Sequence, residues 1–238
     1  SVLEILDYQV ILFIIIFSAL NFTYELSINA KEYEEKNKSI EDVKIDHLDN
    51  CIEIDINYPK LTDKKNENIN KEISLWTDNW IKETQDVLDD YKKSGYICNN
   101  RFELNSRYYI TKDSNNLLSF YIDYYQFSGG AHGSTTRKAY VIDKKLNKKL
   151  SIKELFKIGY DYKTVIDKEI RNQINKNKEK YFVDATTYKG INDDAKFYIK
   201  GENLVIYYNQ YEIAPYASGI PEFNIPINDF KENFLYNN

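Results

Sequence analysis

The sequence predicts an α+β fold made of two strand–helix–strand units, in which antiparallel sheets pack on amphipathic helices. Two observations support this class. Apolar residues recur at every second position in several short segments, which is typical of half-buried strands, and at every third or fourth position in two longer ones, which is typical of helices. The elements also lack the regular strand–helix alternation of parallel sheets, so antiparallel pairing is expected.

The first unit begins with a strand at residues 51–58, whose alternate apolar side chains share one face, and Pro59 is expected to end it. A long helix follows over residues 63–93, with an apolar stripe at spacings of three and four. Asp63 is the expected N-cap and Gly95 the expected stop. The stripe consists of Ile69, Ile73, Trp76, Trp80, Thr84, Val87 and Tyr91.

A meander of three strands completes the first unit. The strands are expected at residues 101–112, 117–127 and 135–144. Residues 113–116 carry the turn signal between the first two strands, which should therefore form a hairpin. The first unit then reads strand, helix and antiparallel meander.

The second unit opens with a short helix at residues 150–156. Ser151 is its expected cap, and Glu154 stands three positions later, which is the spacing of a capping box. A basic amphipathic helix is predicted over residues 161–180, with Val165, Ile166, Ile170 and Ile174 on its apolar side. Strands are then expected at residues 196–200, 203–211 and 222–227, and a short capping helix at residues 228–238.

Composition excludes some classes of function. The chain has 238 residues, of which 42% are hydrophobic, so it can bury a sizeable core. Its 37 acidic and 32 basic residues give a net charge of −5, which argues against nucleic acid as a ligand and favours a basic partner. Two cysteines and two histidines lack the spacing of a zinc site, so neither a metal nor a cofactor is predicted.

Residues 1–24 form an apolar N-terminal segment that we interpret as a signal or a membrane anchor. Its apolar run, residues 10–22, is shorter than the roughly 20 residues of a spanning helix but has the length of a signal-peptide core. The flank lacks the basic residues of a signal sequence, and a buried element of the folded domain is the alternative. Export makes residues 25–45 a charged spacer, and it would allow a disulfide between Cys51 and Cys98, whose formation the sequence leaves open.

Two loops concentrate the unusual backbone geometry of a chain that is poor in glycine and proline. Residues 125–134 and 210–222 together hold four of the eight glycines and two of the four prolines. In the first loop His132 lies near Ser128, and a Ser-His-Asp arrangement is one alternative. No G-x-S-x-G elbow is present, so a loop histidine that bonds to the backbone is the preferred interpretation. The other residues considered for such an arrangement are Asp123, Ser134 and Asp143.

Two further chemical alternatives are weaker. Glu212 and Glu222 lie at the two ends of the second loop and could form the carboxylate pair of a glycoside hydrolase. Residues 128–133 have the glycine content of a phosphate-binding loop, but a strand signal follows them instead of a helix, so no helix N-terminus would face an anion. A non-catalytic surface is therefore favoured over an active site.

Three segments of the chain resemble a known family. They match the paired extracytoplasmic domains of bacterial RsiV-type anti-sigma factors, a pair that also precedes the catalytic domain of PdaC-type peptidoglycan deacetylases. The resemblance extends over about residues 46–230. It implies a PdaC-like module (DUF4163-like) at residues 46–135 and an RsiV C-terminal-like module (DUF3298-like) at residues 136–238. The three segments are Tyr124–Ser134, Leu150–Phe156 and Gln210–Phe223.

The resemblance implies a non-catalytic module of the bacterial envelope that binds or senses another molecule. In the RsiV branch the exported domain is a receptor for lysozyme, so a lysozyme-like protein is the expected partner, with cell-wall glycan as the alternative and a hydrolase as a weaker one. The contact residues that the resemblance implies are Ser128 and His132 in the first loop and Pro215 and Tyr216 in the second. Membrane contact is expected through the N-terminal segment only, in a stand-alone anchored or secreted member of the family or in a fragment of a longer protein.

Overall fold

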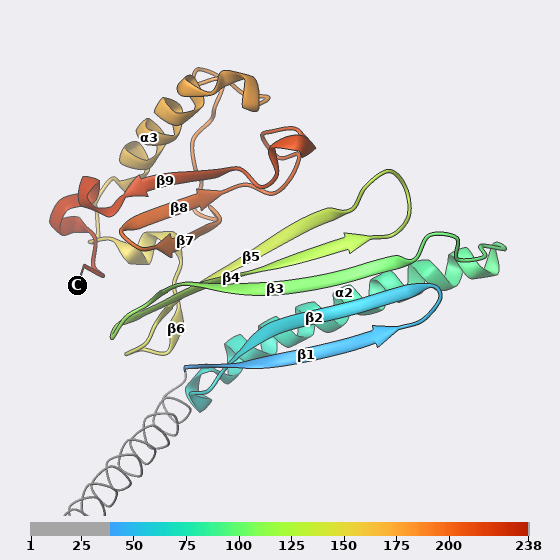
Figure 1. Ribbon diagram of the computed structural model, residues 1–238. Coiled ribbons are helices and arrows are strands. Elements are labelled where there is room, and N and C mark those ends of the chain that lie inside the picture. The colour runs from blue at the N-terminus through green and yellow to red at the C-terminus, as the bar shows by residue number, and fades with distance from the viewer. Residues whose placement is uncertain (1–38, 238) are drawn as a thin grey trace, which may run out of the picture. The chain divides into compact units, whose positions relative to one another are not determined.

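The computed structural model describes residues 39–237, which form two sheets and two α-helices (Figure 1). The first sheet has the strand order β1-β2-β3-β4-β5-β6, and the second has the order β7-β8-β9. This mixed arrangement confirms the predicted α+β class. The strands are β1 (Ile40–Leu48), β2 (Ile52–Leu61), β3 (Phe102–Asp113), β4 (Leu117–Phe127), β5 (Ser134–Asp143), β6 (Lys148–Lys149), β7 (Phe197–Lys200), β8 (Asn203–Tyr207) and β9 (Glu222–Pro226). The helices are α2 (Glu67–Lys93) and α3 (Tyr162–Lys176), with 3₁₀ helices at Lys64–Asn66, Ile152–Leu155, Lys178–Lys180, Tyr216–Ser218 and Ile227–Asn233.

Helix α2 begins and ends near the signals in the sequence. The Asp63 carboxylate accepts a hydrogen bond of 2.9 Å from the backbone N–H of Lys65, and it caps the 3₁₀ turn that leads into the helix. Beyond the last helical residue, the N–H groups of Gly95 and Tyr96 donate to carbonyls of the final turn, and Gly95 has a φ of +91°. This is a Schellman motif, in which glycine adopts the left-handed backbone without a steric penalty.

The buried face of α2 differs from the predicted stripe at three positions. Val87 and Tyr91 belong to the predicted stripe but are exposed, and Trp76 is half-buried. On a straight α-helix, two residues that are seven positions apart differ by about 20° in direction around the helix axis. A stripe that repeats every seven residues therefore rotates gradually away from the helix face that packs on the sheet. The residues that α2 buries are Ile69, Ile73, Thr77, Trp80, Thr84 and Leu88.

The first sheet contains one parallel pair in addition to the antiparallel pairs that the sequence predicted. Strands β2 and β3 run parallel, and their paired register ends at Ile56 beside Ser106. Helix α2 connects them, as a crossover between parallel strands requires. Strand β2 also continues through Pro59 to Leu61, whereas the sequence placed its end at Pro59. Proline has no backbone N–H to donate to a neighbouring strand. The pairing of β2 with β3 ends before Pro59, so this proline removes no hydrogen bond between these two strands.

Strand β1 occupies part of the region for which the sequence predicted a charged spacer. It begins at Ile40, inside the predicted spacer at residues 25–45, and it is the outer strand of the sheet. All its residues after Ile40 are exposed or half-buried, because an edge strand presents charged side chains to water. Its composition therefore resembles that of a linker, which is why the sequence predicted a spacer here. The predicted signal or anchor at residues 1–24 lies outside the described residues. No helix within residues 39–237 is long and apolar enough to cross a bilayer.

The second sheet packs on helix α3. The helix is shorter than the predicted span of residues 161–180, and a separate 3₁₀ turn follows it. Ahead of the helix, the Glu154 carboxylate accepts hydrogen bonds of 2.8 Å from both the N–H and the hydroxyl of Ser151, which confirms the predicted cap. The buried face of α3 consists of Tyr162, Ile166, Ile170 and Ile174, while Val165 is half-buried.

The two sheets meet where β7 lies against β3, β4 and β5. The Ser119 hydroxyl in β4 accepts a hydrogen bond of 2.9 Å from the backbone N–H of Ile199 in β7, and both residues are buried. The strands before α3 belong to the first sheet, and the second unit opens with the short helix Ile152–Leu155, as the sequence predicted. The predicted boundary between residues 135 and 136 falls within β5, which pairs with β4 along its whole length.

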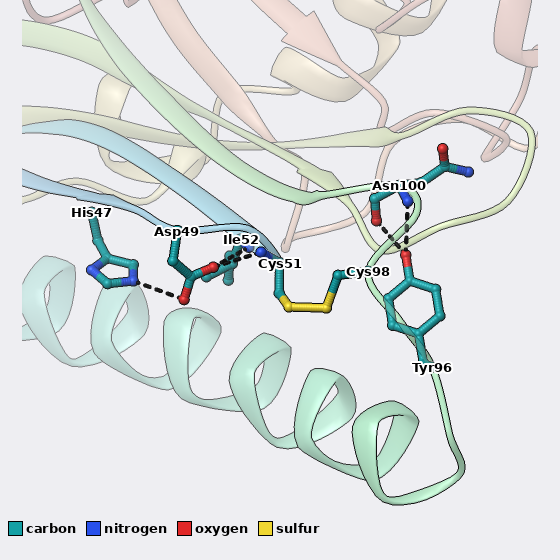
Figure 2. The surroundings of a disulfide bond; sticks show 7 residues. All are labelled: His47, Asp49, Cys51, Ile52, Tyr96, Cys98 and Asn100. Atoms are coloured by element: carbon teal, nitrogen blue, oxygen red, sulfur yellow. Dashed lines mark hydrogen bonds and ion pairs between the residues drawn. A yellow bond between two sulfur atoms is a disulfide. The ribbon is translucent and has the colours of Figure 1, made fainter.

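A disulfide joins Cys51, just before β2, to Cys98 in the loop after α2, with 4.9 Å between the α-carbons (Figure 2). It closes a covalent loop that contains β2 and α2. Asp49 lies in the preceding turn and accepts hydrogen bonds from the N–H groups of Cys51 (2.7 Å) and Ile52 (2.8 Å). These bonds lower the pKa of Asp49 to about 2, with a smaller contribution from His47. The structure thus contains the disulfide between Cys51 and Cys98, whose formation the sequence left open.

Candidate functional site

The two loops singled out in the sequence meet in the structure. The first, residues 128–133, connects β4 to β5, and the second, residues 208–221, connects β8 to β9. Strand β8 ends at Tyr207, four residues earlier than predicted, which leaves a longer second loop. The side-chain oxygen of Gln210 in this loop accepts a hydrogen bond of 2.7 Å from the backbone N–H of Thr135, at the start of β5.

Three aromatic rings from the two loops stack on one another. The rings of His132 and Tyr216 have centroids 4.0 Å apart and planes inclined by 21°. Tyr211 lies beside both, with centroid distances of 6.4 Å to His132 and 5.9 Å to Tyr216. We call these three residues the aromatic cluster. The structure therefore brings together two of the predicted contact residues, His132 and Tyr216, from separate loops.

Hydrogen bonds fix the orientation of the His132 ring. Its Nδ1 lies 2.9 Å from the carbonyl oxygen of Gly133, and because a carbonyl only accepts, Nδ1 carries the hydrogen. In the neutral ring Nε2 is then an acceptor, and it receives the hydroxyl hydrogen of Tyr211 over 3.3 Å. These contacts agree with the interpretation of His132 as a loop histidine bonded to the backbone.

The aromatic cluster is open to solvent. His132 is exposed, 53% of Tyr211 is accessible, and Tyr216 is half-buried. Tyrosine gives a large contact area with a polar tip, and it is enriched among the residues that dominate binding energies. The cluster therefore has the composition of a recognition surface.

Pro215 starts the short turn that carries Tyr216. The N–H of Ser218 donates to the carbonyl of Pro215, and the N–H of Gly219 donates to the carbonyl of Tyr216, each over 2.9 Å. The Ser218 hydroxyl also donates to the carbonyl of Lys180 over 3.1 Å, which ties this turn to the segment after α3. Tyr216 is thus held on a closed turn, and less conformational entropy is lost when such a residue binds a partner.

Ser128 lies at the end of a hydrogen-bonded chain that starts on helix α2. The indole N–H of Trp80 donates to Oε1 of Gln126 over 2.8 Å, and the Gln126 amide donates to Oγ of Ser128 over 2.7 Å. These bonds attach the start of the first loop to the buried face of α2. The contacts of Ser128 place it in this chain and not in the aromatic cluster.

Gly133 is a position where the first loop has no room for a side chain. A β-carbon built there would lie 2.5 Å from the Tyr125 ring and its hydroxyl oxygen. We expect Gly133→Ala to displace this ring and to lower the free energy of unfolding by about 1 kcal/mol, the lower end of the cost of overpacking, because the tip of the ring can move. Urea denaturation measures the change, with Ala131→Ser at an exposed position as the control. Equal stability of the two variants would show that the contact is not restrictive.

A buried arginine lies at the bases of both loops. Arg137 in β5 forms a bidentate ion pair with Asp123 in β4, with N–O distances of 2.6 and 2.7 Å, and a second ion pair with Glu222 in β9. Its guanidinium carbon lies 3.7 Å from the centroid of the Tyr121 ring. Burial disfavours the charge of Arg137, but the hydrogen bonds and charges of its two carboxylate partners outweigh this effect and raise its pKa. The arginine therefore joins the first sheet to the strand that follows the second loop.

Sequence reasoning missed Arg137 as a site residue. It falls inside a correctly predicted strand, but its partners come from two other strands, and no local pattern links the three. The one available signal was the presence of a charged residue in a strand that was expected to pack in the core. A buried charge requires partners of opposite charge, so Arg137 could have been expected to form ion pairs.

The acids that a Ser-His-Asp arrangement would use are occupied elsewhere. Asp123 holds Arg137. The Asp143 carboxylate accepts hydrogen bonds from the N–H groups of Lys145 and Leu146 and from the hydroxyl of Tyr236. The His132 ring bonds to Gly133 and Tyr211, so the described contacts do not assemble this arrangement.

The carboxylate pair considered for glycoside hydrolysis is also held by cations. Glu212 accepts from the ammonium of Lys196 over 2.8 Å and from the N–H of Asn209 over 2.8 Å, while Glu222 pairs with Arg137. Both acids therefore have local structural roles. Over residues 39–237, no group of three or more histidine, cysteine or acidic side chains is arranged to hold a metal ion.

Comparison with known proteins identifies two domains. Residues 45–135 match the model of a family described as deacetylase PdaC, and residues 153–228 match that of a protein family of unknown function, DUF3298. The aromatic cluster draws on both, since His132 lies in the first matched range and Tyr211 and Tyr216 lie in the second.

Two relatives come from Bacillus subtilis (strain 168). The chain is 27% identical over 167 residues to the peptidoglycan-N-acetylmuramic acid deacetylase PdaC, and the match covers 67% of this chain and 34% of that protein. It is 29% identical over 206 residues to the anti-sigma-V factor RsiV, and this match covers 79% of this chain and 68% of that protein. The chain therefore spans about a third of the length of the deacetylase and about two thirds of the anti-sigma factor.

Two solved structures share the fold. A DUF3298-family protein from Bacteroides fragilis NCTC 9343 has a TM-score of 0.59 at 20% identity, with 82% of this chain and 92% of that chain covered. A DUF3298-family protein from Pseudomonas aeruginosa PAO1 has a TM-score of 0.60 at 17% identity, with 83% and 94% covered. At these identities the likeness establishes the fold alone. The two domain matches and the two relatives show that the chain carries RsiV/PdaC-type domains, a PdaC-type domain followed by a DUF3298 domain.

Proposed function

We propose that the chain is a non-catalytic, extracytoplasmic binding module of the bacterial envelope, which recognises a lysozyme-like protein through the aromatic cluster. The observation that carries this proposal is the stack of His132 on Tyr216, which unites two loops into one solvent-open surface. The Cys51–Cys98 disulfide supports an oxidising compartment, as expected for an exported protein. The likeness to RsiV supports a protein as the partner. Anchoring through residues 1–24 belongs to the same proposal.

The charge of the chain supports a basic partner. The net charge of −5 attracts a cationic protein over long range, and such attraction raises association rates more than it raises affinity. Binding energy would instead come from the aromatic cluster, because buried aromatic anchors dominate most protein interfaces. We therefore expect high salt to slow association while affecting dissociation little.

Tyr216→Ala is expected to weaken binding to a purified lysozyme by about 2 kcal/mol or more, a loss of roughly thirtyfold in affinity. The reason is the loss of a partly exposed ring that stacks on His132. Isothermal titration calorimetry measures the change. Tyr216→Phe keeps the stacked ring and should bind nearly as well as the wild-type chain.

Tyr109→Ala is the matched control, because Tyr109 is 49% exposed but lies on β3, away from both loops. This variant should bind with unchanged affinity. If Tyr216→Ala and Tyr109→Ala bind equally well, Tyr216 is not part of the interface.

Cell-wall glycan is the second candidate ligand, and the exposure of Tyr211 favours it, because open tyrosine faces also stack on sugars. Sedimentation of the chain with insoluble peptidoglycan, in the absence of any protein partner, separates the two functions. Binding that is lost in Tyr211→Ala would favour the glycan. Absence of sedimentation would leave the protein partner as the proposed ligand.

A further inference from the structure

A third segment of the chain, which leaves the 3₁₀ turn after α3, runs alongside the second loop (Figure 1). The hydroxyl of Ser218 donates to the carbonyl of Lys180 over 3.1 Å. Two residues further along the segment, the N–H of Phe182 donates to the carbonyl of Ile213 over 2.8 Å. The two bonds reach the loop on either side of Tyr216, so the segment is held beside the part of the loop that carries this residue.

The packing of its neighbours leaves the Phe182 side chain outside the core. The backbone at Tyr181 is extended, with φ −122° and ψ 150°, and successive side chains of an extended chain point to opposite sides. Tyr181 and Val183 both pack against the hydrophobic core, and the Tyr181 ring has its centroid 5.5 Å from that of Phe223. Phe182 stands between them and is 63% exposed. Its exposure therefore follows from the way the segment is anchored.

This exposed ring is not an isolated one. Within residues 39–237, Phe182 and Tyr211 are the two most exposed of the phenylalanine, tyrosine and tryptophan side chains. Single exposed apolar residues are common on protein surfaces, whereas apolar residues that gather in one place mark interaction sites. Phe182 is bonded through its backbone to Ile213, which is two residues from Tyr211 in the chain. The segment after α3 thus adds an apolar side chain next to the loop that supplies two members of the aromatic cluster.

We propose that Phe182 is a further contact residue of this recognition surface, and that it enters an apolar recess of the partner next to the one that receives Tyr216. The inference rests on the proposed function, because it concerns the same protein partner. A phenyl ring offers no hydrogen bond, so this contact suits apolar side chains of a protein better than the hydroxyl groups of a glycan. Rings with few rotatable bonds also lose little conformational entropy when a partner covers them.

Two lysines near Phe182 give this side of the surface a charge opposite to that of the chain as a whole. Lys178 and Lys180 are exposed, and no ion pair involves either of them in the part of the chain that the structure describes. Their charges repel a cationic partner before contact, whereas a phenyl ring acts only once the partner has docked. The most basic face of the partner should therefore lie away from this side. Loss of Phe182 should raise the dissociation rate and leave the association rate unchanged.

Surface plasmon resonance of the full chain against a purified lysozyme tests the inference. Phe182→Ala is expected to weaken binding about tenfold through faster dissociation, while Phe182→Leu, which keeps a large apolar side chain, should retain most of the affinity. Lys180→Glu should instead speed association. Leu146→Ala is the matched control, because Leu146 is 69% exposed in the turn after β5, at the opposite end of that strand from the first loop. This variant should bind as the wild-type chain does.

Tyr216→Ala, measured in the same experiment, separates this inference from the proposed function. If Tyr216→Ala weakens binding and Phe182→Ala matches Leu146→Ala, Phe182 lies outside the interface and only this inference fails. If the wild-type chain does not bind, or if neither aromatic variant differs from the control, both proposals fail. Because the bond to Ile213 involves only the backbone of Phe182, Phe182→Ala should keep the wild-type midpoint in urea. Weaker binding together with a lowered midpoint would assign the side chain to the fold and overturn its role as a contact.

Discussion

Arg137→Met is expected to lower the free energy of unfolding by about 3 kcal/mol, the lower end of the cost of breaking a buried ion pair. The substitution removes the cation that Asp123 and Glu222 share, and it leaves two carboxylates near each other between the sheets. Both acids are partly exposed, which limits the cost. Urea denaturation followed by circular dichroism measures the change.

Two comparisons identify the cause of this loss. Arg101→Met removes an ion pair with Glu53 that is largely exposed, and it should cost less than about 1 kcal/mol. Replacing Asp123 by Asn and Glu222 by Gln in the Arg137→Met background should restore much of the lost stability, because no uncompensated charge then remains. Equal effects of Arg137→Met and Arg101→Met would contradict the role assigned to the buried arginine.

Replacing both Cys51 and Cys98 by serine is expected to lower the free energy of unfolding by about 4 kcal/mol. The disulfide joins residues 47 positions apart, and the chain-entropy model gives this value for a closed loop of that length. The loop contains β2 and α2, so the unfolded chain without the bond gains conformations over much of the PdaC-type domain. Urea denaturation of the double variant against the wild-type chain measures the loss.

Dithiothreitol supplies the matched test. It should lower the stability of the wild-type chain to that of the double variant, and it should leave the double variant unchanged, because the two cysteines are the only ones in the sequence. A double variant as stable as the oxidised wild type would mean that the denatured chain already retains the structure that the bond enforces.

Local signals in the sequence predicted most elements of the fold. Strand β4 has the predicted bounds, the capping box at Ser151 forms, and Gly95 ends helix α2. Each of these depends on residues close together in the chain. Strand β1 was missed because an edge strand has few buried side chains, and the parallel pairing of β2 with β3 was missed because periodicity does not report strand direction.

The candidate site was predictable only in part. The concentration of glycine and proline located both loops, and the family resemblance selected His132 and Tyr216. That their rings stack is a consequence of how the two sheets pack, which no local pattern encodes. Arg137 was missed for the same reason, since its partners Asp123 and Glu222 lie on two other strands.

The outer side of β5 has no neighbouring strand along most of its length, because β6 pairs only with Ile142 and Asp143. Its backbone groups are covered in other ways. The Gln210 side chain receives the N–H of Thr135, the Tyr207 hydroxyl donates to the carbonyl of Arg137, and the N–H of Leu150 donates to the carbonyl of Val141. An uncovered row of such groups recruits strands from other molecules and leads to aggregation. The second loop, β8 and the segment after β6 therefore cover this edge of the first sheet, which protects it from pairing with a strand of another molecule.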